Sequence, residues 1–324
     1  MWNIILWIFS FIAGYFIIFF AVDVFLDNLK ALCILYKVSP FIIGLLILGI
    51  DPEESIASII AAINNLPYIA VGNVIGNSIT ALTVPFALTA LFYKTTFEPV
   101  AQYYFNLIYI SLLCILSAIL FYLGLLFAGI CCIILYISYL IRSLKNVTEK
   151  KTSISNISDE LNNIQLTTEK DIEANKFKKF IMVITGFIFI FLGGELLIIS
   201  AENIIILTTI PESFFGFVII AIVTNVEEIT LILKSIKKQS IEIGLGGMIG
   251  KLIWNLTLTF GISGIIVLNI QFIWISLWNW SILLLLILYF NYISYKGSLD
   301  KVKGLVLITV FFCFIFINFL SISF

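Results

Sequence analysis

Long apolar runs separated by short polar breaks follow one another along the whole 324-residue chain. A hydrocarbon core about 30 Å thick needs roughly 20 apolar residues for each helical crossing. The runs therefore predict ten membrane spans, near residues 2–24, 38–63, 68–92, 102–120, 124–142, 177–205, 213–234, 243–268, 272–294 and 303–323. We expect an all-α integral membrane protein.

The composition agrees with this expectation, because 61% of the residues are hydrophobic and 11% are charged. Soluble domains are roughly 45–50% apolar and about 25% charged. The run from Trp2 to Val24 lacks a basic start and is too long for a signal peptide, so we interpret it as a retained helix. Histidine is absent, so proton chemistry would need carboxylates or a lysine. The chain has no basic patch with interleaved aromatics, which excludes nucleic acid as a partner.

One long polar segment, residues 145–176, separates a first repeat at residues 1–144 from a second at residues 177–324. With ten spans, every Lys and Arg except Lys251 falls in this linker or in loops on the same side of the membrane. By the positive-inside rule that side is cytoplasmic and both termini lie outside. We expect the protein in the plasma membrane, and the oligomeric state is left open.

The two halves carry matching residues, which indicates an internal repeat. The matches are Gly14 with Gly186, Asp23 with Glu195, Gly44 with Gly216, Glu54 with Glu228, Gly72 with Gly246, and Gly76 with Gly250. Each half has five predicted spans, so the second enters the membrane from the opposite side. Inverted repeats of this kind place the substrate site near the midplane, where interrupted helices meet.

Acidic and amide residues lie inside one apolar run of each half. The sequences GLLILGIDPEESIASI and GFVIIAIVTNVEEITLIL contain Asp51, Glu53 and Glu54, and Thr224, Asn225, Glu227 and Glu228. A charge at the centre of the membrane costs roughly 2.5–3.5 kcal/mol, so its presence indicates function. The alternative is that the span borders are wrong and the acids lie at the membrane surface.

A helix rich in small residues follows in each half, AVGNVIGNSITAL and GLGGMIGKLIWNL. Glycines spaced four apart let helices approach closely, and packing alone would account for them. Close approach would also bring Asn77, Ser78, Lys251 and Asn255 to the carboxylates.

At these residues the sequence resembles the calcium/cation antiporter superfamily, to which sodium/calcium exchangers belong. The resemblance spans nearly the whole chain. Members have ten helices, a cytoplasmic loop between the fifth and sixth, and a GTSLPE motif followed by GN(x)xGSN in each repeat. AVGNVIGNS and LGGELLIISAENI match this pattern well, whereas the acidic motif matches only in part.

The resemblance implies a cation site with one acidic metal ligand from each repeat. The implied cation-binding residues are Glu54, Glu228, Asp51, Asn77, Thr224, Asn225, Asn255 and the backbone carbonyl of Ala221, and the site-modulating residues are Lys251, Glu53, Glu227 and Ser78. Glu53 and Glu227 stand where the family has proline, so we expect the helix kink to be lost in the second unit and moved to Pro52 in the first. Ala81 has no ligand atom where the family has one.

The function implied is secondary active cation antiport by alternating access, calcium against sodium, at a midplane site. No covalent chemistry is implied, so the protein is not expected to be an enzyme, and it needs no cofactor besides the transported Ca²⁺, Na⁺ or H⁺. Lys251 favours an alternative, a monovalent cation or proton-coupled antiporter, because two glutamates and one lysine leave a net charge of only −1. Ala81 favours another, a non-transporting membrane protein with a degenerate site.

Overall fold

The computed structural model describes residues 2–35, 52–121, 124–149, 176–225, 232, 241–268, 270–271 and 273–321. Its elements are helices apart from two short strands. They are α1 (Trp2–Leu35), α3 (Pro52–Ile63), α4 (Pro67–Phe92), β1 (Thr95–Thr96), α5 (Gln102–Leu120), α6 (Gly124–Glu149), α8 (Lys176–Thr208), α9 (Glu212–Phe214), η1 (Phe215–Ile220), α10 (Ala221–Thr224), α12 (Ile241–Ile253), η2 (Trp254–Thr259), α13 (Phe260–Val267), α14 (Trp274–Lys296), β2 (Ser298–Leu299) and α15 (Lys301–Leu320).

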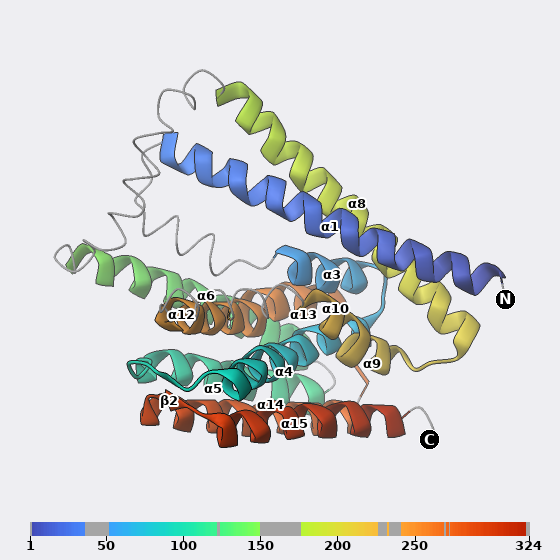
Figure 1. Ribbon diagram of the computed structural model, residues 1–324. Coiled ribbons are helices and arrows are strands. Elements are labelled where there is room, and N and C mark those ends of the chain that lie inside the picture. Colours follow the sequence, from blue (N-terminus) through green and yellow to red (C-terminus); the bar gives the residue numbers. More distant parts are fainter. Residues whose placement is uncertain are drawn as a thin grey trace.

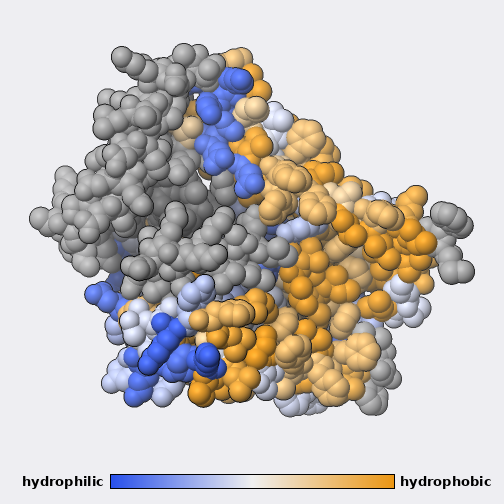
Figure 2. All heavy atoms as spheres, viewed as in Figure 1, coloured by the Kyte–Doolittle hydropathy of each residue, from blue (hydrophilic) through white to orange (hydrophobic). Residues whose placement is uncertain are grey.

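Eight helices within the described residues are long and apolar enough to cross a membrane. They coincide with eight of the ten predicted spans. The other two predicted spans, 38–63 and 213–234, are described in part, as α3 and as the run α9–η1–α10. The expected all-α membrane fold is therefore confirmed, and apolar side chains cover much of the surface that Figure 2 shows.

The packing of the helices follows the internal repeat. The helix α4 packs against α15 and η1, and its counterpart in the second half, α13, packs against α6 and α3. The contact of α4 with α15 thus has an equivalent in the contact of α13 with α6. The central helix α4 is mostly buried, whereas α15 lies on the outside. The carboxylate of Glu212 also joins the halves, because it accepts hydrogen bonds from the backbone N–H groups of Tyr68 (2.7 Å) and Ile69 (3.1 Å) at the start of α4.

The helices α1 and α8 form a separate pair that lies across one face of the bundle (Figure 1). Their backbones approach closely at glycines: a Cβ atom added to Gly14 would lie 2.9 Å from the carbonyl oxygen of Gly193. Asp23 and Glu195 belong to this pair, and Asp23 is exposed on its surface. A structural role for these two acids stays a prediction.

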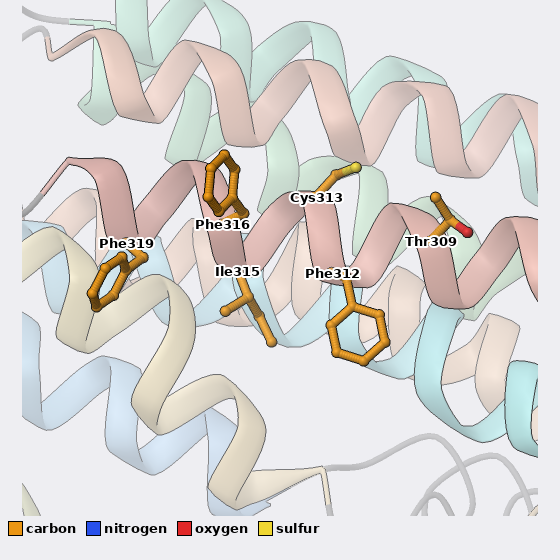
Figure 3. Close-up of a pocket in the computed structure, with 6 residues that line it drawn as sticks. All are labelled: Thr309, Phe312, Cys313, Ile315, Phe316 and Phe319. Atoms are coloured by element: carbon orange, nitrogen blue, oxygen red, sulfur yellow. The ribbon is translucent and has the colours of Figure 1, made fainter.

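Apolar side chains of α15 line a shallow groove on the outside of the bundle (Figure 3). Phe312, Phe316 and Phe319 are all exposed there. Such side chains suit contact with lipid chains, as expected for a membrane protein.

Both termini lie at one end of the molecule, and β2 and the start of α8 lie at the other (Figure 1). In Figure 2 the hydrophilic residues gather toward this second end. The strands β1 and β2 pair there in antiparallel fashion and tie two loops together. Most of the linker, residues 150–175, lies outside the described residues, so its cytoplasmic position and the exact repeat borders stay predictions.

Candidate functional site

The interrupted helix of the first half begins at the acidic motif. Pro52 is the first residue of α3, a position where its missing N–H costs nothing. Glu53 and Glu54 follow in the first turn and are both buried, Glu54 with 1% of its surface exposed. The residue before Pro52 lies outside the described residues, so the expected kink at Pro52 stays a prediction.

In the second half the expectation of a continuous helix is wrong, because α10 ends at Thr224 although the chain has no proline there. The side chains near the end compete for the backbone carbonyls. Thr224 Oγ1 donates to the carbonyl oxygen of Ile220 (3.0 Å), and Asn225 Nδ2 donates to that of Ala221 (2.7 Å). Asn225 itself has left the helical conformation.

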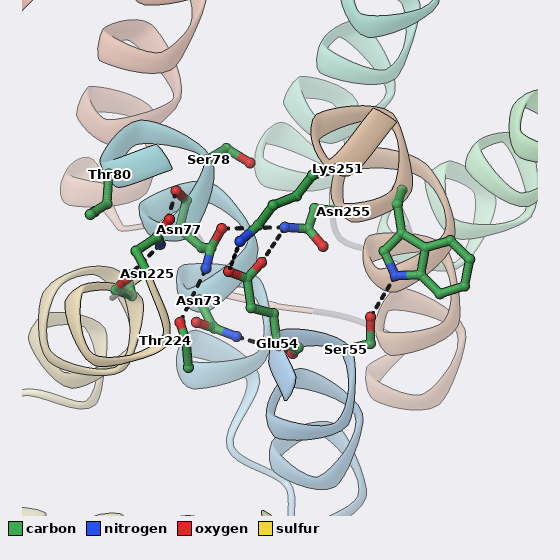
Figure 4. Close-up of polar contacts among 12 residues, drawn as sticks. Glu54, Ser55, Asn73, Asn77, Ser78, Thr80, Thr224, Asn225, Lys251 and Asn255 are labelled. Carbon is green, nitrogen blue, oxygen red and sulfur yellow. Dashed lines mark hydrogen bonds and ion pairs between the residues drawn. The ribbon is translucent and has the colours of Figure 1, made fainter. Parts of the chain in front are cut away.

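The carboxylate of Glu54 is held from the opposite half of the chain (Figure 4). The ammonium of Lys251 lies 2.7 Å from Glu54 Oε1, and Asn255 Nδ2 donates to Glu54 Oε2. Lys251 is 7% exposed and Asn255 is 1% exposed, so this ion pair is buried. A buried ion pair is tolerated only with close geometry and further hydrogen bonds, and both are present.

Asn77 extends the polar cluster to the end of α10. Asn255 Nδ2 also donates to Asn77 Oδ1 (3.3 Å), and Asn77 Nδ2 donates to Thr224 Oγ1 (3.1 Å). Asn225 Nδ2 reaches the carbonyl oxygen of Asn77 (3.4 Å). The cluster thus joins α3 and α4 of the first half to α10 and the α12–η2 helix of the second.

The structure brings together seven of the residues that the sequence singled out: Glu54, Asn77, Ala221, Thr224, Asn225, Lys251 and Asn255. Ser78 is buried, but its hydroxyl donates to the carbonyl oxygen of Val74 on its own helix. Ala81 is also buried.

Three predicted residues, Asp51, Glu227 and Glu228, lie outside the described residues. The pairing of Glu54 with Glu228 across one ion therefore stays a prediction. Within the described part of the chain, no three His, Cys, Asp or Glu residues form a group that could hold a metal. In the contacts described above, the carboxylate of Glu54 is joined by neutral oxygens, and the carboxylate of Glu53 is buried one residue before it.

The sequence reasoning missed the residues that support this cluster from behind. Asn73 Nδ2 donates to the backbone carbonyl of Glu54 (3.2 Å) and to Ser58 Oγ (2.9 Å). Asn73 lies one helical turn before Asn77, and that spacing could have identified it.

A second support lies on the other side of Glu54. The hydroxyl of Ser55 is hydrogen-bonded to that of Thr259 (2.7 Å) and accepts from Trp254 Nε1 (2.7 Å). These contacts fix the start of α3 against η2, so the backbone that carries Glu54 is held from both sides.

The solved structures most similar in fold include two of the sodium-calcium exchanger NCX_Mj. One was soaked with 10 mM Na⁺ and zero Ca²⁺; it is 19% identical, and the match covers 96% of this chain and 98% of that one with a TM-score of 0.57. The other was soaked with 10 mM Na⁺ and 10 mM Sr²⁺; it is 20% identical, with coverages of 96% and 97% and a TM-score of 0.59. At this identity the likeness shows a common fold.

Sequence comparison gives the family. The uncharacterized membrane protein MJ0091 of Methanocaldococcus jannaschii is 24% identical over 243 residues, which make up 74% of this chain and 75% of that protein. The family model described as sodium/calcium exchanger protein matches residues 6–145 and 178–320. With most of its length matched in two segments, the chain belongs to the sodium/calcium exchanger protein family.

Proposed function

We propose that the protein is a secondary active cation antiporter that works by alternating access. The observation that carries this proposal is the buried cluster around Glu54, in which side chains of both halves meet. A carboxylate at this depth is costly unless it serves a cation or a fixed positive group. Because the Glu54 carboxylate contacts the second half, its exposure to water depends on how the two halves pack against each other.

The interrupted helices supply the moving parts. The helix α10 ends at Thr224 beside the cluster, and by the repeat we expect a matching break before Pro52, where the described part of α3 begins. Helix ends leave backbone groups that can replace water around an ion. Tilting one half against the other would open the cluster first to one side of the membrane and then to the other. Sodium and calcium are the first ions to test because they give the family its name.

Exchange in proteoliposomes tests this function. Vesicles that contain the purified protein and unlabelled sodium should take up external ²²Na⁺ far faster than vesicles loaded with choline. The reason is that the binding site of an antiporter turns back to the outside only when it carries an ion. The variant Glu54→Gln should lose this exchange. Glu98→Gln serves as the matched control, since Glu98 lies exposed in the loop after β1.

Loss of exchange in both variants, or uptake that ignores the internal ion, would contradict the proposal. A wild-type protein that folds but exchanges neither ²²Na⁺ nor ⁴⁵Ca²⁺ would instead favour the non-transporting alternative.

A further inference from the structure

The charges at the cluster are arranged for something other than a divalent ion. Both oxygens of the Glu54 carboxylate face hydrogen-bond donors, the Lys251 ammonium at 2.7 Å and the amide nitrogen of Asn255. Figure 4 shows these two side chains on one side of Glu54 and Asn77 and Thr224 on the other. Each oxygen keeps a further lone pair, so a metal cation in contact with Glu54 would share the carboxylate with the Lys251 ammonium and the Asn255 amide.

The two donors differ in how they could give way. An amide presents an oxygen after rotation by half a turn, so Asn255 can change from donor to ligand. An ammonium has three N–H donors and no acceptor, and in any rotamer Lys251 brings its charge with it. The lysine is fixed on α12 and is 7% exposed, so it remains next to the carboxylate.

A calcium ion fits this arrangement poorly. Ca²⁺ takes six to eight oxygen ligands at about 2.3–2.6 Å, often with several carboxylates among them. In the described part of the cluster the charge of Glu54 is already matched by that of Lys251. A divalent ion would therefore meet the fixed positive charge of Lys251, and further negative charge would have to come from Glu53 or from Asp51, Glu227 and Glu228, which lie outside the described residues.

A monovalent cation fits better, because neutral oxygens remain beside the ion pair. Asn225 is 2% exposed, and no donor within the described residues reaches its Oδ1 atom. A buried acceptor of this kind normally has a partner, which a bound cation or water would supply. The hydroxyl of Thr224 and the carbonyl oxygen of Ala221 lie on the same helix end.

We propose that the Lys251 ammonium permanently fills one cation position next to Glu54, so that the protein exchanges monovalent cations and rejects calcium. This proposal rests on the antiport function above and names its substrate class. Lys251 thus determines the charge of the ion that is accepted. The lysine supplies one positive charge from the protein, and the transported ion adds one more positive charge at the neutral oxygens.

Calcium binding to purified protein in detergent tests the role of the lysine without any transport. Isothermal titration and calcium-dependent thermal unfolding should show no calcium binding by the wild type at millimolar concentrations. Lys251→Ser removes the fixed charge and should raise calcium affinity at least tenfold, with a higher unfolding temperature in calcium. Adding Glu54→Gln to this variant should abolish the gain.

Two further variants serve as controls. Lys251→Arg keeps the charge and should still bind no calcium. Lys301→Ser removes an exposed lysine at the start of α15, outside the cluster, and should behave like the wild type. Size-exclusion chromatography checks that each variant is folded, and Lys251→Met provides a second neutral variant if Lys251→Ser does not fold.

Calcium binding by the wild type, or no gain by a folded neutral variant, would overturn the role of Lys251 and leave antiport intact. If Lys251→Ser gains calcium binding but the wild-type protein shows no ²²Na⁺ exchange, the antiport function alone would be refuted.

Discussion

Glu54 and Lys251 dominate the molecule at the scale of single residues. Each is a charged group whose removal from water costs several kcal/mol, and each compensates the other at 2.7 Å. The sequence identified both from their depth in apolar runs. It could not show that they form an ion pair, because they lie 197 positions apart (251 − 54) and only the folded packing of the two halves joins them.

The ion pair predicts a strong coupling between its members. Glu54→Gln should lower the free energy of unfolding by about 3–5 kcal/mol, because it leaves a buried positive charge without this carboxylate. Lys251→Met should also destabilise, but the double variant should lose much less than the two single losses added together. Chemical unfolding of the four proteins in detergent gives the coupling. Additive losses would show that the two groups do not interact.

The supporting side chains were harder to predict than the charged ones. Asn73 and Ser55 are ordinary polar residues in membrane helices, and their role depends on which helix faces they occupy. Their partners, Ser58 for Asn73 and Thr259 for Ser55, become evident only when α3, α4 and η2 are packed together.

At the scale of helices, the close packing of the central elements determines where the cluster forms. The glycine pair of α4 was predicted from sequence spacing, and the structure places it against η1. Gly246, the equivalent of Gly72, has no atom of the described residues within 4 Å of an added Cβ, so the described packing at this position differs from that at Gly72. The absence of a proline predicts a continuous helix here, whereas the hydrogen bonds of the Thr224 and Asn225 side chains to backbone carbonyls accompany the end of α10.

The tightly packed Gly76 of α4 and the open Gly246 of α12 make a paired test. A Cβ atom on Gly76 would lie 2.0 Å from the carbonyl oxygen of Phe217, so Gly76→Ala must push α4 away from η1. We expect the free energy of unfolding to fall by about 1–3 kcal/mol and sodium exchange to be lost. Gly246→Ala should be tolerated or slightly stabilising, because alanine favours helices. Thermal unfolding of both variants checks this, and equal effects would contradict the described packing.

At the scale of the whole molecule, hydropathy predicted the all-helical membrane fold, and eight of the ten spans appear as described long helices. This succeeded because the length of an apolar run reports directly on membrane thickness. The two shorter elements, α3 and α9–η1–α10, belong to the interrupted spans. Polar residues of the cluster interrupt the apolar pattern inside these two spans, so their borders are the least predictable from hydropathy.

The orientation of the molecule can be tested with introduced cysteines in a variant without the native ones. Asn65 lies in the exposed turn between α3 and α4, and Thr96 is exposed in β1 at the opposite end of α4. With both termini outside, a cysteine at Asn65 should react with an impermeant thiol reagent in intact cells. Cysteines at Thr96 and at Thr152 in the linker should react only after the membrane is permeabilised. The reverse pattern would show that the orientation is inverted.

The charge of the exchanged ion is the most direct test of the account. Vesicles with wild-type protein or Lys251→Ser are loaded with either unlabelled sodium or calcium, and the uptake of ²²Na⁺ and ⁴⁵Ca²⁺ is measured with the same ion inside. We predict sodium exchange without calcium exchange for the wild type, and calcium exchange for Lys251→Ser. Rapid ⁴⁵Ca²⁺ exchange by the wild-type protein, with Lys251 in place, would contradict it.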